Sequence, residues 1–369
     1  MLIDAMGLIL ADNERIRLGK IDEPRSLAAV PFAGRHRIID FTLSNMVNSG
    51  IRRVGIVALT RYKSLMDHTG TGSWWDLDRI RQGLFMIPPY VNMTTRRPDR
   101  TDSQSIIDYV ESGHQEYVII SGCEFVASMS YLPLLDAHLV NGADITMLCI
   151  RDKGKYSIPA VTIDVDDGGR VTDVLVDHPS PKSDLRAVSL LVLKRDLLLE
   201  ILQDRMARGY SDFSALDLFR LYDTLTVRTL IHDDLLLRIT NIAQYFSASM
   251  ALLDDENRHK LFSEEHPIYT KVKNRAPCLV TPESLTLRNV LASDGCMIRG
   301  NVENSVLSRG VVIGRGAQVR NSVLFQDVQI SEGVTLDHVI IDKNVVIKMG
   351  VRLLGQDDYP IVIEKNAIV

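Results

Sequence analysis

Long apolar segments and abundant cysteines are both missing from this sequence, which excludes two broad classes of protein. No run of about 18 apolar residues occurs, so no membrane-spanning helix is predicted. The apolar run at the N-terminus is too short for a signal peptide, and we expect a cytoplasmic protein with no membrane partner. The four cysteines, Cys123, Cys149, Cys278 and Cys296, show no metal-like pairing. We therefore expect no disulfide framework, and most of these thiols should be buried and reduced.

The chain also lacks an excess of positive charge and a composition typical of disorder. Its 42 Lys and Arg residues and 47 Asp and Glu residues give a formal net charge of -5, without a long basic tract. No nucleic-acid partner is expected from such a charge distribution. Hydrophobic residues at 46% and charged residues at 24% are typical of a soluble globular protein. The length of 369 residues favours two domains, one of them large.

The first two-thirds of the chain alternates short apolar runs with helix-like stretches such as 38–49. The apolar runs lie at 5–10, 53–59, 117–121 and 145–150. Runs without polar alternation indicate strands buried on both faces, so we predict an α/β domain over 1–245 with a mostly parallel sheet. Its active face should lie at the carboxyl ends of the strands. A helical stretch and many turn formers follow, which predict a linker with a helix over 246–283.

The last part of the chain, residues 284–369, repeats itself. The sequence of Asn304–Leu307 returns unchanged in Asn321–Leu324, 17 positions later, and again in a related form at His338–Ile341. Apolar residues also recur at intervals of six, as at Ile313, Val319 and Phe325. Short strands stacked in three-sided coils produce both periods, with these apolar residues pointing inward. We predict a parallel β-helix; the alternative is a β-sandwich with accidental spacing.

The stretch AAVPFAGRHRIIDFTLSNMVNSGIRRVGIV, residues 28–57, closely resembles the N-terminal signature of bacterial ADP-glucose pyrophosphorylases, the glucose-1-phosphate adenylyltransferases. Residues 74–79 (WWDLDR) and 116–122 (EYVIISG) extend this resemblance. It implies a Rossmann-like (GT-A-like) nucleotidyltransferase domain followed by a left-handed β-helix. It also implies the reaction of ATP and glucose 1-phosphate with Mg²⁺, which requires carboxylates for the metal and positive charges for the phosphates.

The phosphate-binding loop of that family, GGxGxRL, is degenerate in this chain. Its glycines let backbone N–H groups approach the triphosphate because glycine carries no Cβ. Asp12, Asn13 and Arg15 occupy the three glycine positions here. Leu27 stands in place of the lysine of the family's KPAVPF segment. Arg17 and Leu18 are retained. The resemblance therefore implies that triphosphate does not bind in the usual pose.

The metal-binding positions of the family are also replaced. Cys123 stands where the SGDH motif has an aspartate, and Arg238 aligns with a second aspartate in a WxDVGT segment. A thiol is a poor ligand for Mg²⁺, and an arginine repels it. Glu124 is the alternative, as a shifted ligand. We expect no catalytic residue to be intact and no metal or cofactor on this chain, with Mg²⁺ used by a catalytic partner.

Two further segments carry candidate binding residues. The family's sugar-phosphate segment Glu-Lys-Pro corresponds to Asp177 and His178 here, followed by a proline; the alternative is a solvated strand end. Arg35, His36 and Arg37 lie where related chains meet anionic effectors, such as a sugar phosphate or a nucleotide. Guanidinium groups suit phosphate well, and a solvated surface is the alternative.

The combined loss of loop, lysine and metal ligands favours a regulatory function. The pattern resembles the non-catalytic GlgD-type subunits of the family, which pair with a catalytic GlgC-type subunit. We expect this chain to enter such a hetero-oligomer, a heterotetramer, and to activate its partner in glycogen biosynthesis. The alternatives are a nucleotidyltransferase with residual activity of its own, and a module that senses a nucleotide or a sugar phosphate.

Overall fold

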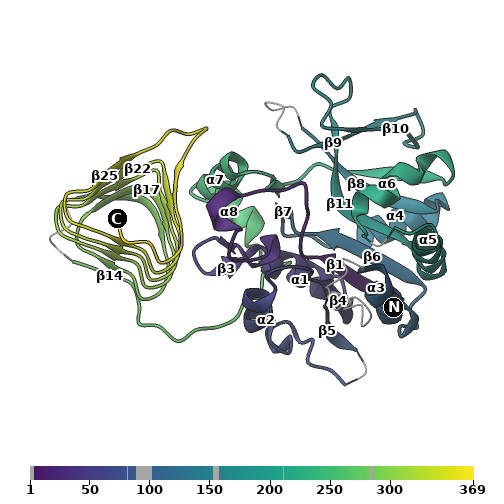
Figure 1. The fold of residues 1–369 in the computed structure, drawn as a ribbon, viewed down its shortest axis with the longest axis horizontal. Helices are drawn as coiled ribbons and strands as arrows, with labels where there is room; N and C mark the ends of the chain where they lie inside the picture. The colour runs from purple at the N-terminus through teal and green to yellow at the C-terminus, as the bar shows by residue number, and fades with distance from the viewer. Residues whose placement is uncertain (1–3, 81, 89–101, 153–157, 211, 282–285) are drawn as a thin grey trace.

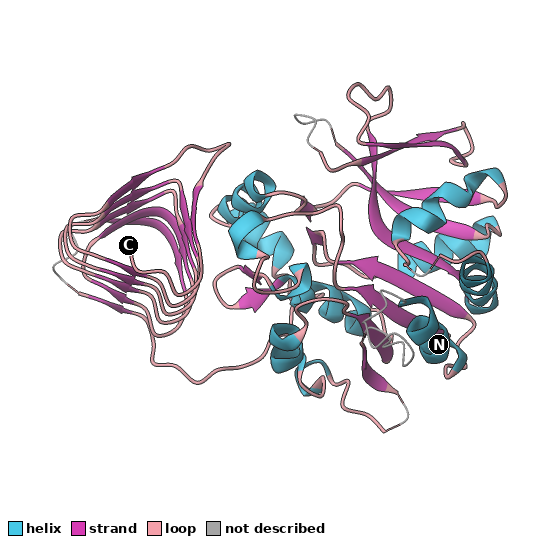
Figure 2. Ribbon diagram, in the orientation of Figure 1, coloured by secondary structure: helices cyan, strands magenta, loops and turns pink. Residues whose placement is uncertain are grey.

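The computed structural model describes residues 4–80, 82–88, 102–152, 158–210, 212–281 and 286–369. An α/β domain and a stack of flat coils lie side by side (Figure 1). Helices cover both faces of the central sheet in the first part, and strands make up the second (Figure 2). None of the helices in the described ranges has both the length and the apolar character that crossing a membrane requires.

The central sheet confirms the predicted α/β domain. Its strands are β1 (Ala5–Leu10), β4 (Arg53–Val57), β5 (Gly83–Ile87), β6 (Tyr117–Gly122), β8 (Ile145–Arg151), β9 (Val161–Val165), β10 (Val171–Val176), β11 (Leu185–Lys194) and β12 (Val227–His232). Strands β5, β4, β1 and β6 run parallel in that order, and β8 runs parallel to β12. Strand β11 is antiparallel to both β6 and β8 and so joins the two parallel groups.

Helices cover both faces of this sheet because its strands are apolar on both sides. The α-helices are α1 (Ile38–Asn48), α2 (Lys63–Thr69), α3 (Asp102–Glu111), α4 (Leu132–Asn141), α5 (Arg195–Ala207), α6 (Ala215–Phe219), α7 (Ile242–Ala251) and α8 (Asp255–Leu261), and the 3₁₀ turns are η1 (Gly19–Ile21), η2 (Leu27–Ala29), η3 (Ser73–Trp75) and η4 (Arg220–Asp223). In β1, Ile9 packs into the core that contains α1 and α7, whereas Leu8 and Leu10 pack into the core that contains α3, α5 and α6. Alternate side chains of one strand thus serve two cores.

The expected boundary at residue 245 falls inside α7. Tyr245 and Phe246 of this helix are buried in the same core as α1, and Leu261 of α8 joins them. The first strand of the coils, at 279–280, precedes the expected start at 284. Helices α7 and α8 therefore pack as part of the α/β domain, and the extended segment 262–278 connects this domain to the coils.

The C-terminal domain is a parallel β-helix. Its strands are β14 (Leu279–Val280), β15 (Leu287–Ala292), β16 (Met297–Ile298), β17 (Asn301–Leu307), β18 (Val312–Ile313), β19 (Gln318–Arg320), β20 (Val323–Leu324), β21 (Gln329–Ile330), β22 (Thr335–Asp337), β23 (Val339–Ile341), β24 (Val346–Ile347), β25 (Arg352–Leu354) and β26 (Ile361–Ile363). Val323 pairs with Val306 on one side and Ile340 on the other, 17 positions away in each direction. All strand pairs described in this domain are parallel, which excludes the sandwich.

The prediction that Phe325 points into the β-helix is wrong. Ile313 and Val319 do point inward, but the next inward residue is Leu324, because a 17-residue coil has one side that is a residue short of six. Phe325 points outward and packs against the ring of Tyr245 in α7, with ring centroids 6.1 Å apart. The assumption of a strict six-residue interval was wrong by one position here. Because successive side chains of a strand point to opposite faces, an error of one position exchanges inside for outside.

This outward face of the coils holds the two domains together. Val306, Val323 and Ile340, which form a column on successive coils, are buried in the core of the α/β domain. Beside them Asp342 accepts hydrogen bonds from Nη2 of Arg25 at 2.9 and 3.0 Å. The Arg25 and Asp342 side chains are only 3% and 0% exposed. The ion pair therefore lies in a dry interface, where an unpaired charge is costly.

Asp342→Ala should destabilise the chain strongly, because it leaves the Arg25 guanidinium buried without its carboxylate. Breaking a buried pair costs about 3–5 kcal/mol, and we expect the free energy of unfolding from a urea titration to fall by that amount. The double variant with Arg25→Ala should lose less free energy of unfolding than the two single variants together, because both changes remove the same ion pair.

A second ion pair between the same domains provides the control. Lys20 Nζ and Glu364 Oε2 are 3.0 Å apart, but their side chains are 51% and 57% exposed. Glu364→Ala should leave the urea midpoint unchanged, since water and salt screen such pairs. An equal loss in free energy of unfolding in the Asp342 and Glu364 variants would contradict the importance assigned to the buried pair.

Candidate functional site: a degenerate cleft and a cationic crevice

A cavity of about 430 Å³ lies at the carboxyl ends of the central strands. Leu10 and Gly122, the last residues of β1 and β6, line it, as expected for the active face of a parallel sheet. A Cβ at Gly122 would lie 2.1 Å from Oε2 of Glu124 and 2.8 Å from Cβ of Ser189, so any other residue here would displace these side chains. Several of the predicted site residues also line this cavity: Asp12, Asn13, Arg15 and Arg238.

The loop after β1 is stabilised by its own polar side chains. Oδ1 of Asn13 accepts a hydrogen bond from the backbone N–H of Arg15 at 3.1 Å, so an amide side chain organises this turn. Burial raises the pKa of Asp12, although backbone N–H groups partly offset the effect. Arg17 and Leu27 do not line the cavity: Nη1 of Arg17 donates to the carbonyl of Ile16, and Leu27 is buried in the core. The loop presents a carboxylate and a guanidinium to the cavity.

The structure brings two separately predicted sites together. Nη2 of Arg15, in the phosphate loop, lies 2.9 Å from Oδ2 of Asp177, in the sugar-phosphate segment. The same nitrogen donates to the carbonyl of Ala160 at 3.3 Å, and the N–H of Ala160 donates to Oδ1 of Asp177 at 2.8 Å. His178 is exposed and accepts a hydrogen bond from the N–H of Ser180. Arg15 and Asp177 therefore neutralise each other at one edge of the cavity, and His178 takes no part.

Cys123 lies in the core and does not face the cavity. Its Sγ is 4.0 Å from Oγ1 of Thr42 in α1, and burial raises its pKa well above the usual range. The next residue, Glu124, does face the cavity; its Oε1 accepts a hydrogen bond from the N–H of Ser189 at 2.7 Å. Its Oε2 is buried without a hydrogen-bond partner in the described part of the chain. A protonated thiol in an apolar core is not a metal ligand.

Arg238 places a cation on the other side of Glu124. It lies in β13 (Leu237–Arg238), which pairs with β7 (Phe125–Val126) directly after Glu124. Its guanidinium is 3.4 Å from Oδ2 of Asp152 and donates to the carbonyl of Pro159 at 3.1 Å. Burial lowers the pKa of Arg238, while the charges of Asp152 and Glu124 oppose that shift.

These residues do not fit a magnesium ion. Mg²⁺ requires oxygen ligands, usually carboxylates, in near-octahedral geometry. Glu124 is a carboxylate in the cavity, but the Arg238 guanidinium lines the same cavity and interacts with its charge. Within the described ranges, no group of three or more His, Cys, Asp or Glu side chains is arranged to hold a metal.

The second site lies between the two domains, beside the turn of β2 (Pro31–Phe32) and β3 (His36–Arg37). Ala33 and Gly34 adopt positive φ angles of 50° and 74° and turn the chain, which brings residues 35–37 to a narrow crevice. Arg37 caps α1, since its N–H donates to Oδ2 of Asp40 at 3.0 Å, and its guanidinium donates to Ser64. Burial lowers the pKa of Arg37 to about 10.

His36 differs from its two arginine neighbours. Its ring packs against Phe41 and Phe262, and burial lowers its pKa to about 4. It is therefore neutral at physiological pH, so only Arg35 and Arg37 contribute the cationic charge that the sequence assigned to all three residues. Arg35 is exposed at the mouth of the crevice.

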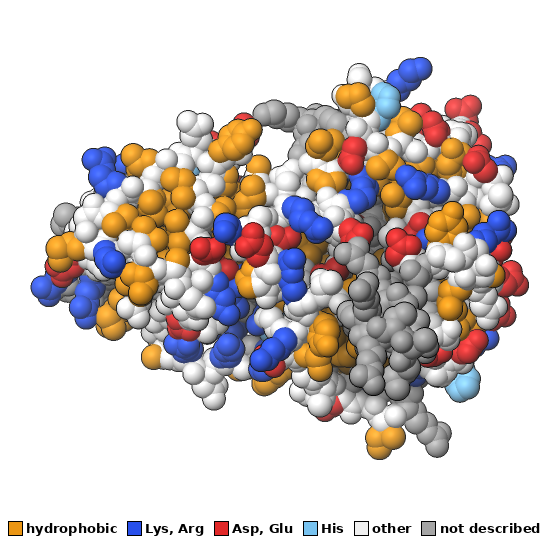
Figure 3. Space-filling view, viewed as in Figure 1, with side chains coloured by type: hydrophobic (Ala, Val, Ile, Leu, Met, Phe, Trp, Pro, Cys, Tyr) orange, Lys and Arg blue, Asp and Glu red, His pale blue; other side chains and the backbone are white. Residues whose placement is uncertain are grey.

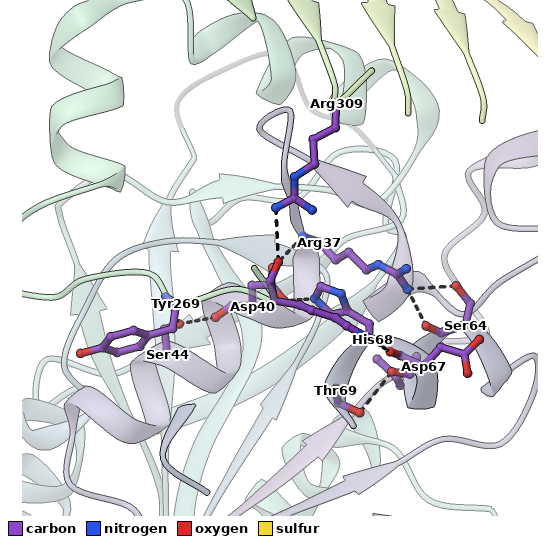
Figure 4. Close-up of polar contacts among 11 residues, drawn as sticks. Arg37, Asp40, Ser44, Ser64, Asp67, His68, Thr69, Tyr269 and Arg309 are labelled. Carbon is purple, nitrogen blue, oxygen red and sulfur yellow. Dashed lines mark hydrogen bonds and ion pairs between the residues drawn. The ribbon is translucent and has the colours of Figure 1, made fainter. Parts of the chain in front are cut away.

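The β-helix and the connecting segment supply further cations that sequence reasoning missed. Arg309, Gln326 and Lys343 line the crevice from one corner of three successive coils, and Lys273 from the connecting segment joins them. Figure 4 shows Arg309 reaching from the β-helix toward the carboxylate of Asp40, which attracts it; Arg309 also donates to the carbonyl of Lys271 at 3.3 Å. Figure 3 shows Lys and Arg side chains gathered along the junction of the two domains. The sequence does indicate this cluster, because Arg309, Gln326 and Lys343 are 17 residues apart and therefore lie above one another in successive coils.

The surroundings of Lys343 in this crevice disfavour its charged form. Burial, followed by repulsion from Arg37 and Arg25, lowers its pKa to about 7, and the attraction of Asp342 does not compensate. Lys273 also has a lowered pKa, through burial and then repulsion from Arg309. A cluster of like charges of this kind is relieved by a bound anion.

Comparisons with known proteins agree with this architecture. A nucleotidyl transferase family model matches residues 6–217, and a GlmU-like C-terminal hexapeptide model matches residues 281–359. Together with the parallel coils, the second match confirms the left-handed β-helix that the resemblance implies.

Individual relatives match most of the chain. The glycogen biosynthesis protein GlgD of Geobacillus stearothermophilus is 37% identical over 318 residues, covering 85% of this chain and 82% of the relative. The GlgD protein of Bacillus subtilis is 31% identical, covering 85% and 82%. The glucose-1-phosphate adenylyltransferase of Geobacillus stearothermophilus is 31% identical, covering 85% and 83%. This chain therefore belongs to the glucose-1-phosphate adenylyltransferase (ADP-glucose pyrophosphorylase) family, within which it is similar to the GlgD proteins.

Proposed function

We propose that this chain is a non-catalytic, regulatory subunit of a bacterial glucose-1-phosphate adenylyltransferase in glycogen biosynthesis. The observation that carries the proposal is the arginine pair of the cleft. Arg238 lines the same cavity as Glu124 and interacts with its charge, and Arg15 is paired with Asp177, where the resemblance places the phosphate and sugar-phosphate positions. The names of the GlgD relatives support the assignment to glycogen biosynthesis.

The chemistry of the reaction explains why such a cleft is inactive. Attack of a sugar phosphate on the α-phosphorus of ATP requires a metal ion to offset the charge that develops on the phosphate oxygens. On this proposal the chain binds no Mg²⁺, and the Mg²⁺ of the complex belongs to a catalytic GlgC-type partner. Asp12 adds a further carboxylate where the triphosphate would have to lie, and like charges repel.

Regulation requires that the chain distinguish two states of its partner. A subunit that binds the active and inactive forms equally shifts no equilibrium, whatever its affinity. In our proposal the chain joins the GlgC-type subunit in a heterotetramer and binds the active form more tightly. The cationic crevice is the proposed effector site, because it couples the α/β domain to the β-helix and attracts a sugar phosphate or a nucleotide.

The proposal predicts that this chain releases no pyrophosphate by itself. With ATP, glucose 1-phosphate and Mg²⁺, we expect no turnover from this chain alone and a higher turnover or apparent substrate affinity of the co-encoded catalytic subunit when both are co-expressed. A continuous pyrophosphate assay on the three preparations measures this. Turnover by this chain alone would support an active enzyme instead. Ligand-induced thermal stabilisation without an effect on the partner would support a sensing module.

The effector site predicts anion binding that weakens as pH rises. Lys343 is charged below its pKa of about 7 and neutral above it, so anion affinity should fall from about pH 6 to about pH 8. Sulfate is the suitable probe, since it stays a dianion throughout. We expect its dissociation constant, from thermal-shift titrations, to rise about tenfold, the effect of losing one charge-assisted hydrogen bond. His36 contributes little above pH 6, because its pKa is about 4.

Two lysine variants isolate the contribution of Lys343. Lys343→Met should bind sulfate weakly at every pH and lose the pH dependence. Lys348→Met, at an exposed position of the same domain, should behave like the unmodified chain. A pH dependence that persists in Lys343→Met would assign the titration to another group and remove Lys343 from the site.

A further inference from the structure

Two of the four cysteines lie next to each other in the folded chain. Cys278 ends the connecting segment and directly precedes β14, and Cys296 directly precedes β16. Strands β14 and β16 pair in parallel with Leu279 opposite Met297, which places Cys278 opposite Cys296. The N–H of Leu279 donates to the carbonyl of Cys296 at 2.8 Å, and the Cys296 thiol is close enough to lower the pKa of Cys278 against the effect of burial.

This geometry suits a disulfide bond. Neighbouring parallel strands are about 4.8 Å apart, and disulfides join Cα atoms that are roughly 4.4–6.8 Å apart. The thiols differ in access: Cys278 is exposed, whereas Cys296 is buried and donates to the carbonyl of Ser308 at 3.2 Å. Cys123 and Cys149 are buried in the two cores of the other domain. An oxidant in solution therefore reaches Cys278 first and finds a resolving thiol beside it.

We propose that Cys278 and Cys296 form a reversible disulfide, with glutathione disulfide as the oxidant. The Cys278 thiolate attacks one sulfur of glutathione disulfide, forms a mixed disulfide and expels one glutathione thiolate. The Cys296 thiolate then attacks Sγ of Cys278, forms the protein disulfide and expels the second glutathione. Two protein thiols lose two electrons and two protons, and one glutathione disulfide becomes two glutathione molecules.

The disulfide would fix the segment that connects the two domains. This segment is bound to the α/β domain at its start, where the N–H of Tyr269 donates to Oγ of Ser44 and the carbonyl of Pro267 accepts from Asn48. At its end it contacts the coils through the short strand β14 and through Arg275, which is 2.9 Å from Asp327. A covalent bond at Cys278 attaches this end to the next coil and so restrains Lys273 and Arg275, which lie between the two anchors.

Peptide mass spectrometry of the full chain tests the proposal. After incubation with glutathione disulfide, we expect a peptide pair linked through Cys278 and Cys296, and loss of maleimide labelling at Cys278 that dithiothreitol restores. Burial raises the pKa of both thiols, that of Cys296 to about 11. The rate of oxidation should therefore rise with pH in the neutral range, as the thiolate fraction grows.

Matched variants separate the two steps. Cys296→Ser should accumulate one glutathione on Cys278, because the resolving thiol is missing, and Cys278→Ser should form neither the adduct nor the crosslink. Cys149→Ser, in a distant core, should still form the crosslink. A stable glutathione adduct on Cys278 of the unmodified chain, or no reaction there at all, would overturn the proposal. If Cys296→Ser does not fold, the Cys278→Ser result and the linked peptide of the unmodified chain still decide the question.

Discussion

The 17-residue coil is the constraint on which the rest of this structure depends. Because one side of each coil is a residue short of six, Leu324 points inward and Phe325 points outward. Strand alternation then directs Leu307, Leu324 and Ile341 into the core of the β-helix, and Val306, Val323 and Ile340 into the core of the neighbouring domain. The outward residues bury the α7 helix, and one of them, Asp342, receives the buried Arg25 guanidinium. The relative placement of the two domains follows from this register.

The same register builds the cationic crevice. Arg309, Gln326 and Lys343 follow directly after the outward positions of three coils, so they gather at one corner, opposite the turn that carries Arg35 and Arg37. Each domain supplies only a few of these charges, and the crevice exists only when the domains are docked. In the proposed function, an anion in this crevice contacts both domains at once, and this contact is the physical basis of the proposed regulation.

The cleft at the strand ends holds ion pairs of the chain's own residues at the positions where the family resemblance places nucleotide and metal. The backbone ends β1 and β6 at a cavity, and two arginines at this cavity are paired with carboxylates of the same chain. Arg15 pairs with Asp177, and Arg238 contacts Asp152 and Pro159. The Arg238 pair is the more buried of the two, and such a charge requires a partner because it is shielded from water.

The sequence by itself determined the two folds, the 17-residue period and the replaced ligand positions, because these depend on local pattern and on a long motif at 28–57. It could not determine side-chain direction at Phe325, where one residue of register decides between inside and outside. Nor could it show that Cys123 lies in the core, that His36 is neutral, or that Arg15 meets Asp177, since these properties depend on burial and on contacts between distant segments. Cys278 and Cys296 are separate in the sequence, and only the stacking of coils places them together. Local chemistry thus determined the elements, and their packing decided which charges and thiols meet.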